Sequence, residues 1–78
     1  MPYYCVQSRS QAGPMRTYWV QAKSATLART LVALNVAAAV DARDETLFDC
    51  IQDDTRKPPA GLIYSDTERP IAIKVSAG

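Results

Sequence analysis

The stretch that decides the fold is Thr17-Tyr18-Trp19-Val20-Gln21-Ala22-Lys23-Ser24-Ala25-Thr26-Leu27-Ala28. Its first half is rich in aromatic and β-branched residues and predicts the centre of a strand over residues 15–22. Ser24 is a favoured helix N-cap, because its hydroxyl can accept a hydrogen bond from a free amide of the first helical turn. The stretch therefore predicts a strand that leads into a helix beginning at Ala25.

Short segments with strand character lie on both sides of this unit. A loop that contains Gly13-Pro14 separates the strand predicted over 3–8 from 15–22, so a hairpin is expected. Further strands are predicted over 47–52, 62–64 and 71–75. The order β-β-α-β-β-β predicts an α+β fold, in which one main helix packs on one face of an antiparallel sheet of four to five strands. Residues 1–78 are too few for two domains, so a single domain is expected.

The apolar pattern of the helix leaves its length and its inward face open. One face is formed by leucines at helical spacing, Leu27, Leu31 and Leu34. If the Ala-rich run continues the helix to Ala42, as helix propensity favours, the opposite side carries a valine stripe made of Val32, Val36 and Val40. An exposed stripe of this kind is typical of a homodimer interface. In the alternative, the helix ends at Asn35 in a left-handed C-cap, and the later valines turn inward.

The residue types that most catalytic sites need are scarce. The chain has no histidine, and its three glycines lack the spacing of a phosphate-binding loop. Cys5 and Cys50 match no paired metal spacing, and no histidine is present to activate either thiol as a nucleophile. The aspartates match no calcium-binding loop. We therefore expect a protein that is not an enzyme and that has no cofactor and no metal site.

The sequence also bears on the cellular compartment. It lacks the basic and apolar regions of a signal peptide and has no apolar run long enough for a membrane span, so a cytoplasmic location without membrane association is expected. In a reducing cytoplasm Cys5 and Cys50 are expected to be free, buried thiols. A disulfide between them is the alternative if their strands are neighbours.

Charge is segregated along the chain despite a net charge of +1. Residues 1–40 carry basic side chains and no acid, which defines a candidate basic surface of Arg9, Arg16, Lys23 and Arg29. Residues 41–54 define a candidate acidic surface of Asp41, Asp44, Glu45, Asp49, Asp53 and Asp54.

The basic surface and the nearby aromatic residues fit a small nucleic-acid-binding module, although a pI near 7.8 disfavours it. The acidic surface fits a basic surface on a protein partner. A dimeric structural or accessory protein is a third alternative, which uses the valine stripe.

The unit of residues 17–31, followed by the strands over 47–52 and 62–75, resembles the small phage-encoded anti-CRISPR proteins. The resemblance lies in chain length and in the strand-helix-strand-strand layout, and no family motif aligns residue by residue. It implies an inhibitor, from a phage or mobile element, that binds a subunit of a type I CRISPR effector complex and blocks recognition of target DNA. A protein partner of this kind is the leading expectation.

Overall fold

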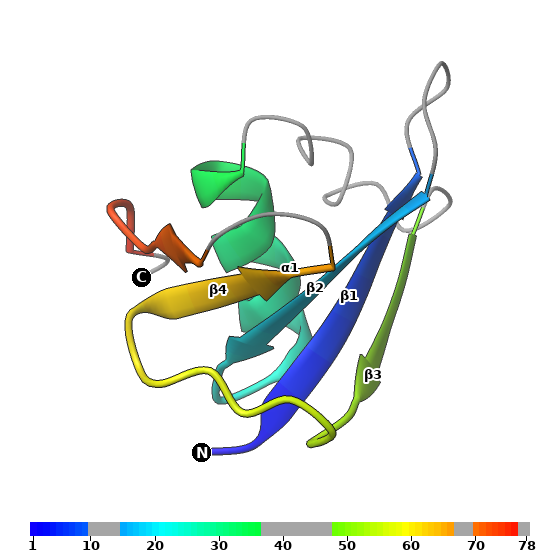
Figure 1. Cartoon of the computed structure of the whole chain (residues 1–78), viewed down its shortest axis with the longest axis horizontal. Coiled ribbons are helices and arrows are strands. Elements are labelled where there is room, and N and C mark those ends of the chain that lie inside the picture. Colours follow the sequence, from blue (N-terminus) through cyan, green and yellow to red (C-terminus); the bar gives the residue numbers. More distant parts are fainter. Residues whose placement is uncertain (10–14, 37–47, 67–69, 77–78) are drawn as a thin grey trace.

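The computed structural model describes residues 1–9, 15–36, 48–66 and 70–76. Its strands form one antiparallel sheet in the order β3-β1-β2-β4-β5, and α1 packs on one face of that sheet (Figure 1). The predicted α+β class, the two layers and the element order are therefore confirmed. The elements are β1 (Tyr3–Arg9), β2 (Met15–Gln21), α1 (Ala25–Asn35), β3 (Phe48–Gln52), β4 (Leu62–Ser65) and β5 (Ile71–Ala72).

The predicted strand-to-helix unit is present. β2 pairs with β1 along its whole length, from Tyr3 opposite Gln21 to Arg9 opposite Met15. Ser24 then caps α1, because its Oγ accepts a hydrogen bond of 3.2 Å from the backbone N–H of Leu27. The cap fixes where α1 begins. Pairing with β1 on one side and with β4 on the other places β2 at the centre of the sheet.

Small and β-branched residues of α1 face the sheet. Ala28, Val32 and Ala33 are buried in the core, whereas Leu27 and Leu31 are only partly buried against it. The leucine face that the helical spacing defines is therefore only partly turned to the sheet, and Val32, which the spacing places on the opposite side, lies in the core. Alanine side chains allow a helix to approach a sheet closely, which leaves the longer leucines to spread along the sides of the contact. The core cluster consists of Val6, Tyr18, Val20, Ala22, Ala28, Val32, Ala33, Val36 and Ile63.

The helix ends before the predicted valine stripe can form. Val36 is extended, with φ −115° and ψ 109°, so the continuation of α1 beyond Asn35 is wrong at its first residue. Val32 is 0% exposed and Val36 is 6% exposed, so the interpretation of these two valines as an exposed dimer stripe is also wrong. Val40 and Ala42 lie outside the described residues.

Asn35 ends the helix by a different device from the predicted left-handed cap, since no described residue other than glycine has a positive φ. Its side-chain amide donates to the carbonyls of Leu31 and Val75, both at 2.9 Å. Its Oδ1 accepts from the backbone N–H groups of Lys74 and Val75, both at 2.8 Å. Asn35 thus holds the segment after β5 against the end of α1. The strand predicted over residues 71–75 is also shorter than expected, because β5 has two residues.

Candidate functional site

The free edge of β3 is the first component of the candidate site. β3 pairs with β1 on one side and, among the described residues, with no strand on the other. The N–H of Asp53 donates to the carbonyl of Tyr3 at 2.9 Å, which sets the alternation of the antiparallel ladder. Odd-numbered residues of β3 therefore direct their backbone groups to β1. The N–H and C=O groups of Cys50 and Gln52 point to the free edge.

Ile51 gives this edge an apolar anchor. Its side chain is 61% exposed, although β-branched aliphatic residues are usually buried. Ile51 lies opposite Cys5, and Cys5 lies opposite Trp19, on the face of the sheet that α1 does not cover. The exposed isoleucine is thus the outermost position of an apolar row that crosses the sheet.

A depression of about 540 Å³ lies at the end of β3. Its lining residues are Pro2, Tyr3, Gln52, Asp53, Asp54 and Lys57. The N–H of Thr55 donates to Oδ1 of Asp53 at 2.8 Å. Hydrogen bonding by Thr55 is the main reason why the pKa of Asp53 lies below its usual value, so this carboxylate is ionised throughout the neutral range. The depression therefore holds two carboxylates and one ammonium group.

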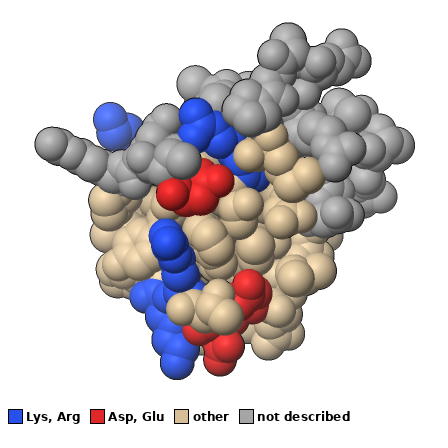
Figure 2. Space-filling view, turned by 45° about the vertical axis from the view of Figure 1, so that its right-hand side comes forward, with Lys and Arg blue, Asp and Glu red and all other residues tan. Residues whose placement is uncertain are grey.

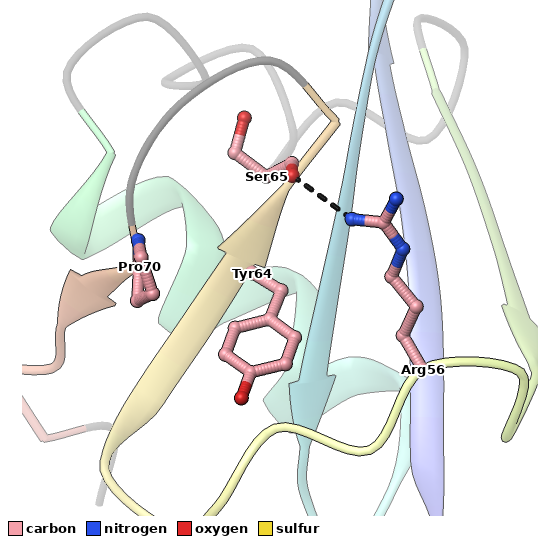
Figure 3. A pocket seen from close by; sticks show the side chains of 4 residues that line it. All are labelled: Arg56, Tyr64, Ser65 and Pro70. Carbon is pink, nitrogen blue, oxygen red and sulfur yellow. Dashed lines mark hydrogen bonds between the residues drawn. The ribbon is translucent and has the colours of Figure 1, made fainter.

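The segment between β3 and β4 covers part of the second face of the sheet. Pro58 is fully buried there, and the guanidinium carbon of Arg56 lies 4.4 Å from the centroid of the Trp19 ring. Arg56 also reaches β4, because its Nη1 donates to the carbonyl of Ser65 at 3.2 Å (Figure 3). The segment joins β4 through Gly61, whose φ of 90° favours glycine. Arg56 thus ties the covering segment to the two strands beneath it.

The indole N–H of Trp19 is buried under this cover, and it has no hydrogen-bond partner among the described residues. The same group lowers the pKa of Asp53, although the two side chains do not meet the geometry of a hydrogen bond. A second depression, of about 210 Å³, is lined by Arg56, Tyr64, Ser65 and Pro70 (Figure 3). Its one cationic group already stacks on Trp19 and bonds to Ser65, so this hollow is a weaker binding candidate than the edge of β3.

Charged side chains of both signs alternate in a strip when the β3 side of the molecule is turned forward, and uncharged surface lies next to them (Figure 2). The guanidinium of Arg16 on β2 forms an ion pair of 4.0 Å with the carboxylate of Asp66. An exposed pair at this distance contributes little to stability. The described part of the surface in this view is neither a basic nor an acidic field (Figure 2).

The structure separates the residues of the predicted basic surface. Arg16 lies near the start of β2 and Lys23 follows its end, which places them about 20 Å apart at the rise of a strand. Arg29 lies on α1, and its Nη2 donates to Oγ1 of Thr26. The side chain of Arg9 lies outside the described part of the structure.

The aromatic residues beside that surface are also unsuited to stacking on bases. Tyr18 is 3% exposed in the core, and Tyr4 packs against the core. Trp19 lies under Arg56. A platform of exposed rings, which single-stranded nucleic acids use, is not formed by these three residues.

Two residues of the predicted acidic surface come together at the end of β3. Asp53 and Asp54 line the same depression. Asp49 pairs with Gln7 in the ladder, and its side chain is not described. Asp41, Asp44 and Glu45 lie outside the described residues.

Cys5 and Cys50 are both free thiols, so the alternative of a disulfide between them is wrong. Their register explains this result, because Cys5 lies opposite Ile51 and the two thiols point to opposite faces of the sheet. Sγ of Cys50 lies 3.7 Å from the carbonyl of Ala25, on the helix side. Burial raises the pKa of Cys5 and raises that of Cys50 to about 11, so both thiols are protonated at neutral pH.

Within the described ranges, no group of three or more histidine, cysteine or acidic residues is placed to hold a metal ion. The described part of the chain likewise has no helix with the length and apolar character that crossing a membrane requires. No protein-family model, curated protein or solved structure matches the chain.

Sequence reasoning missed Ile51, Gln52 and Arg56. A signal for Ile51 was present, because alternation places it on the face opposite Cys50, where a polar residue is expected beside solvent. No sequence signal existed for Gln52 or Arg56. Their importance depends on the position of β3 at the edge of the sheet and on the path of the segment after it.

Proposed function

We propose that this chain is a non-enzymatic binding domain that captures an extended segment of a protein partner as an additional strand on β3. The observation that carries the proposal is the free edge itself. Backbone groups of Cys50 and Gln52 point outward there, next to the exposed side chain of Ile51. Strand addition uses such an edge, with main-chain hydrogen bonds for affinity and neighbouring side chains for specificity.

The state of the thiols supports a binding role over a catalytic one. A nucleophilic cysteine requires a lowered pKa and an activating base. Cys50, with a pKa of about 11, is present as thiolate in only about one molecule in a thousand at pH 8. Cys5 is shifted in the same direction by burial.

The finer proposal concerns the partner and rests on the resemblance to anti-CRISPR proteins. The captured segment belongs to a subunit of a CRISPR effector complex, and the bound domain blocks recognition of target DNA. An inhibitor of this kind needs a docking surface and no catalytic centre. The edge of β3 is a surface of that type.

A substitution at Gln52 tests both levels of the proposal. Proline lacks an N–H, and the N–H of Gln52 points to the free edge, so Gln52→Pro removes an outward donor while the β1–β3 pairing remains. Gln52→Ala keeps the donor and serves as the matched control. Phage plaque assays in cells with active type I CRISPR interference should show protection by the wild-type chain and by Gln52→Ala, and none by Gln52→Pro.

A second measurement, co-purification of the effector complex, tests strand addition on β3 and the identity of the partner separately. Capture of the complex that is lost in Gln52→Pro supports strand addition. Capture that is equal in Gln52→Pro refutes the edge as the docking site. Intact interference with no captured subunit refutes the CRISPR partner, and a gel-shift series with single-stranded DNA then tests the nucleic-acid alternative.

A further inference from the structure

If a partner strand adds to β3 as proposed above, the side chains beside this edge also define the direction and the residue types of that strand. We infer that the partner strand runs antiparallel to β3 and carries a basic residue two positions before an apolar residue. The sheet edge forms the site. The side chains beside the edge specify which strand binds there.

The direction follows from the ladder that the new strand would extend. Every strand pair in the described sheet is antiparallel. Antiparallel pairs are slightly more stable per residue than parallel pairs. An added antiparallel strand would form its hydrogen bonds with Cys50 and Gln52, whose backbone groups point outward.

The apolar position follows from Ile51. Its backbone groups point to β1, so a residue of the added strand opposite Ile51 is in a non-hydrogen-bonded pair, in which side chains lie closest together. An apolar side chain there would cover the exposed surface of Ile51. A polar side chain at this position would lose contact with water against the apolar surface of Ile51 and gain no hydrogen bond from it.

The basic position follows from the depression at the end of β3. Asp53 continues the register by one pair opposite Tyr3, so a residue two positions earlier in the added strand lies opposite Asp53. Its carboxylate is ionised, and one oxygen already accepts from Thr55, which leaves lone pairs for a further donor. Asp54 is exposed beside it, and Tyr3 lines the same hollow. An arginine suits this combination, because it binds carboxylates and stacks on aromatic rings.

The net negative charge of the hollow favours a basic residue over an acidic one in the added strand. Asp53 and Asp54 outnumber Lys57 among its lining residues. An acidic residue at the same position would face two carboxylates, and a nucleic-acid phosphate would face the same repulsion. The inference therefore excludes a nucleic acid as the occupant of this edge.

Four synthetic peptides of one length test the inference with the full chain. The probe is acetyl-Thr-Thr-Arg-Thr-Val-Thr-Thr-amide. Its partners carry Glu or Gln in place of Arg, or the same residues in reversed order. Binding is followed by the amide resonances of Cys50 and Gln52 in ¹H–¹⁵N spectra.

We expect the Arg peptide to bind about fivefold more tightly than the Gln peptide and the reversed peptide, with the Glu peptide weakest. Asp53→Asn and Asp54→Asn should each reduce the preference for Arg. Asp66→Asn should leave it unchanged, because Asp66 lies beside Thr17 near the start of β2, whereas Asp53 lies beside Tyr3 at the other end of the sheet. High salt should also reduce the preference.

The outcomes separate the two proposals. Equal binding of all four peptides, abolished by Gln52→Pro, overturns the basic-residue inference and leaves strand addition intact. Equal binding of the Arg peptide and the reversed peptide overturns the antiparallel direction. Absence of any binding overturns the inference, and the plaque assay with Gln52→Pro then decides on strand addition separately. Tighter binding of a dT12 oligonucleotide than of the Arg peptide at the same resonances overturns the assignment of a protein segment.

Discussion

The two edges of the sheet are built in opposite ways. β5 has two residues, follows Pro70, and is succeeded by backbone N–H groups that Asn35 already occupies. β3 has five residues, and one of them, Ile51, is 61% exposed. Short strands, prolines and charged residues are the usual means by which proteins protect sheet edges from unwanted pairing.

The difference between the two edges shows that β3, and not β5, can still pair with an additional strand. An unprotected edge is a liability for aggregation unless a partner uses it. The protected edge in this sheet is the β5 edge. The side chain of Asn35 accepts hydrogen bonds there from the backbone N–H groups of Lys74 and Val75, which are 39 and 40 residues away in sequence. The contrast between the edges is therefore the physical basis of the proposed function.

The largest expected effect comes from a pair of proline substitutions in β3. Ile51→Pro removes an N–H that points to β1 and should lower the free energy of unfolding by about 3 kcal/mol, most of the stability of a domain this small. Gln52→Pro removes an outward N–H and should change it by less than about 1 kcal/mol. Urea denaturation followed by circular dichroism measures both. Equal losses would contradict the assigned direction of the backbone groups.

The next effect concerns the protected edge. Asn35→Ala removes four hydrogen bonds, three of which hold the segment after β5, and it should cost about 1–2 kcal/mol because water replaces part of them. Thermal denaturation measures the loss, and hydrogen exchange at Lys74 and Val75 should become fast. Thr30→Ala, which removes one exposed bond on α1, is the control. Unchanged exchange at both amides would mean that β5 is protected by other contacts.

A smaller effect is expected where the covering segment ties β2 to β4. Arg56→Ala removes the stacking on Trp19 and the bond to Ser65, which should cost about 0.5–1 kcal/mol for a contact of this kind. The fluorescence of Trp19, the single tryptophan, should shift to the red as its ring gains contact with water. Lys57→Ala should leave the emission unchanged. A matching shift in both variants would show that the stacking does not shield the ring.

The last effect is absent at pH 7 and develops only in alkali. Folding raises the pKa of Cys50 to about 11, chiefly by burial, so the folded state keeps a proton that the unfolded state loses near the ordinary thiol pKa of 9.0. The contribution of the Cys50 thiol to the free energy of unfolding is therefore fully present below about pH 9, and it is lost as pH rises from 9 to 11. Cys5 contributes with the same sign. Urea midpoints from pH 7 to 10.5 measure the fall, which Cys50→Ser should reduce.

Much of the architecture could be predicted because it depends on local physics. Ser24 caps α1 wherever the helix packs, since its partner is the N–H of Leu27 three residues away. The strand positions follow from residue types and from the Gly and Pro residues between them. Asp53 and Asp54 could be named as a candidate surface because they are adjacent in sequence.

The rest depends on contacts between distant residues. The face of α1 that turns inward depends on how closely the helix meets the sheet, which favoured Ala28, Val32 and Ala33 over the leucines. The end of α1 depends on the hydrogen bond between Asn35 and the carbonyl of Val75. The distance between Arg16 and Lys23 depends on the full length of β2. Local patterns cannot encode these outcomes, because each arises from the packing of segments that are remote in the chain.

The sequence by itself determined the helix start, the strands, the α+β class and the lack of histidine chemistry, because these depend on residue type and local spacing. Only the tertiary structure decided that β3 lies at the edge, because strand order is set by long-range pairing. It also decided that Ile51 is exposed there and that Asp53 and Asp54 share a hollow with Tyr3. The candidate site is thus a product of strand order, which no single stretch of this sequence contains.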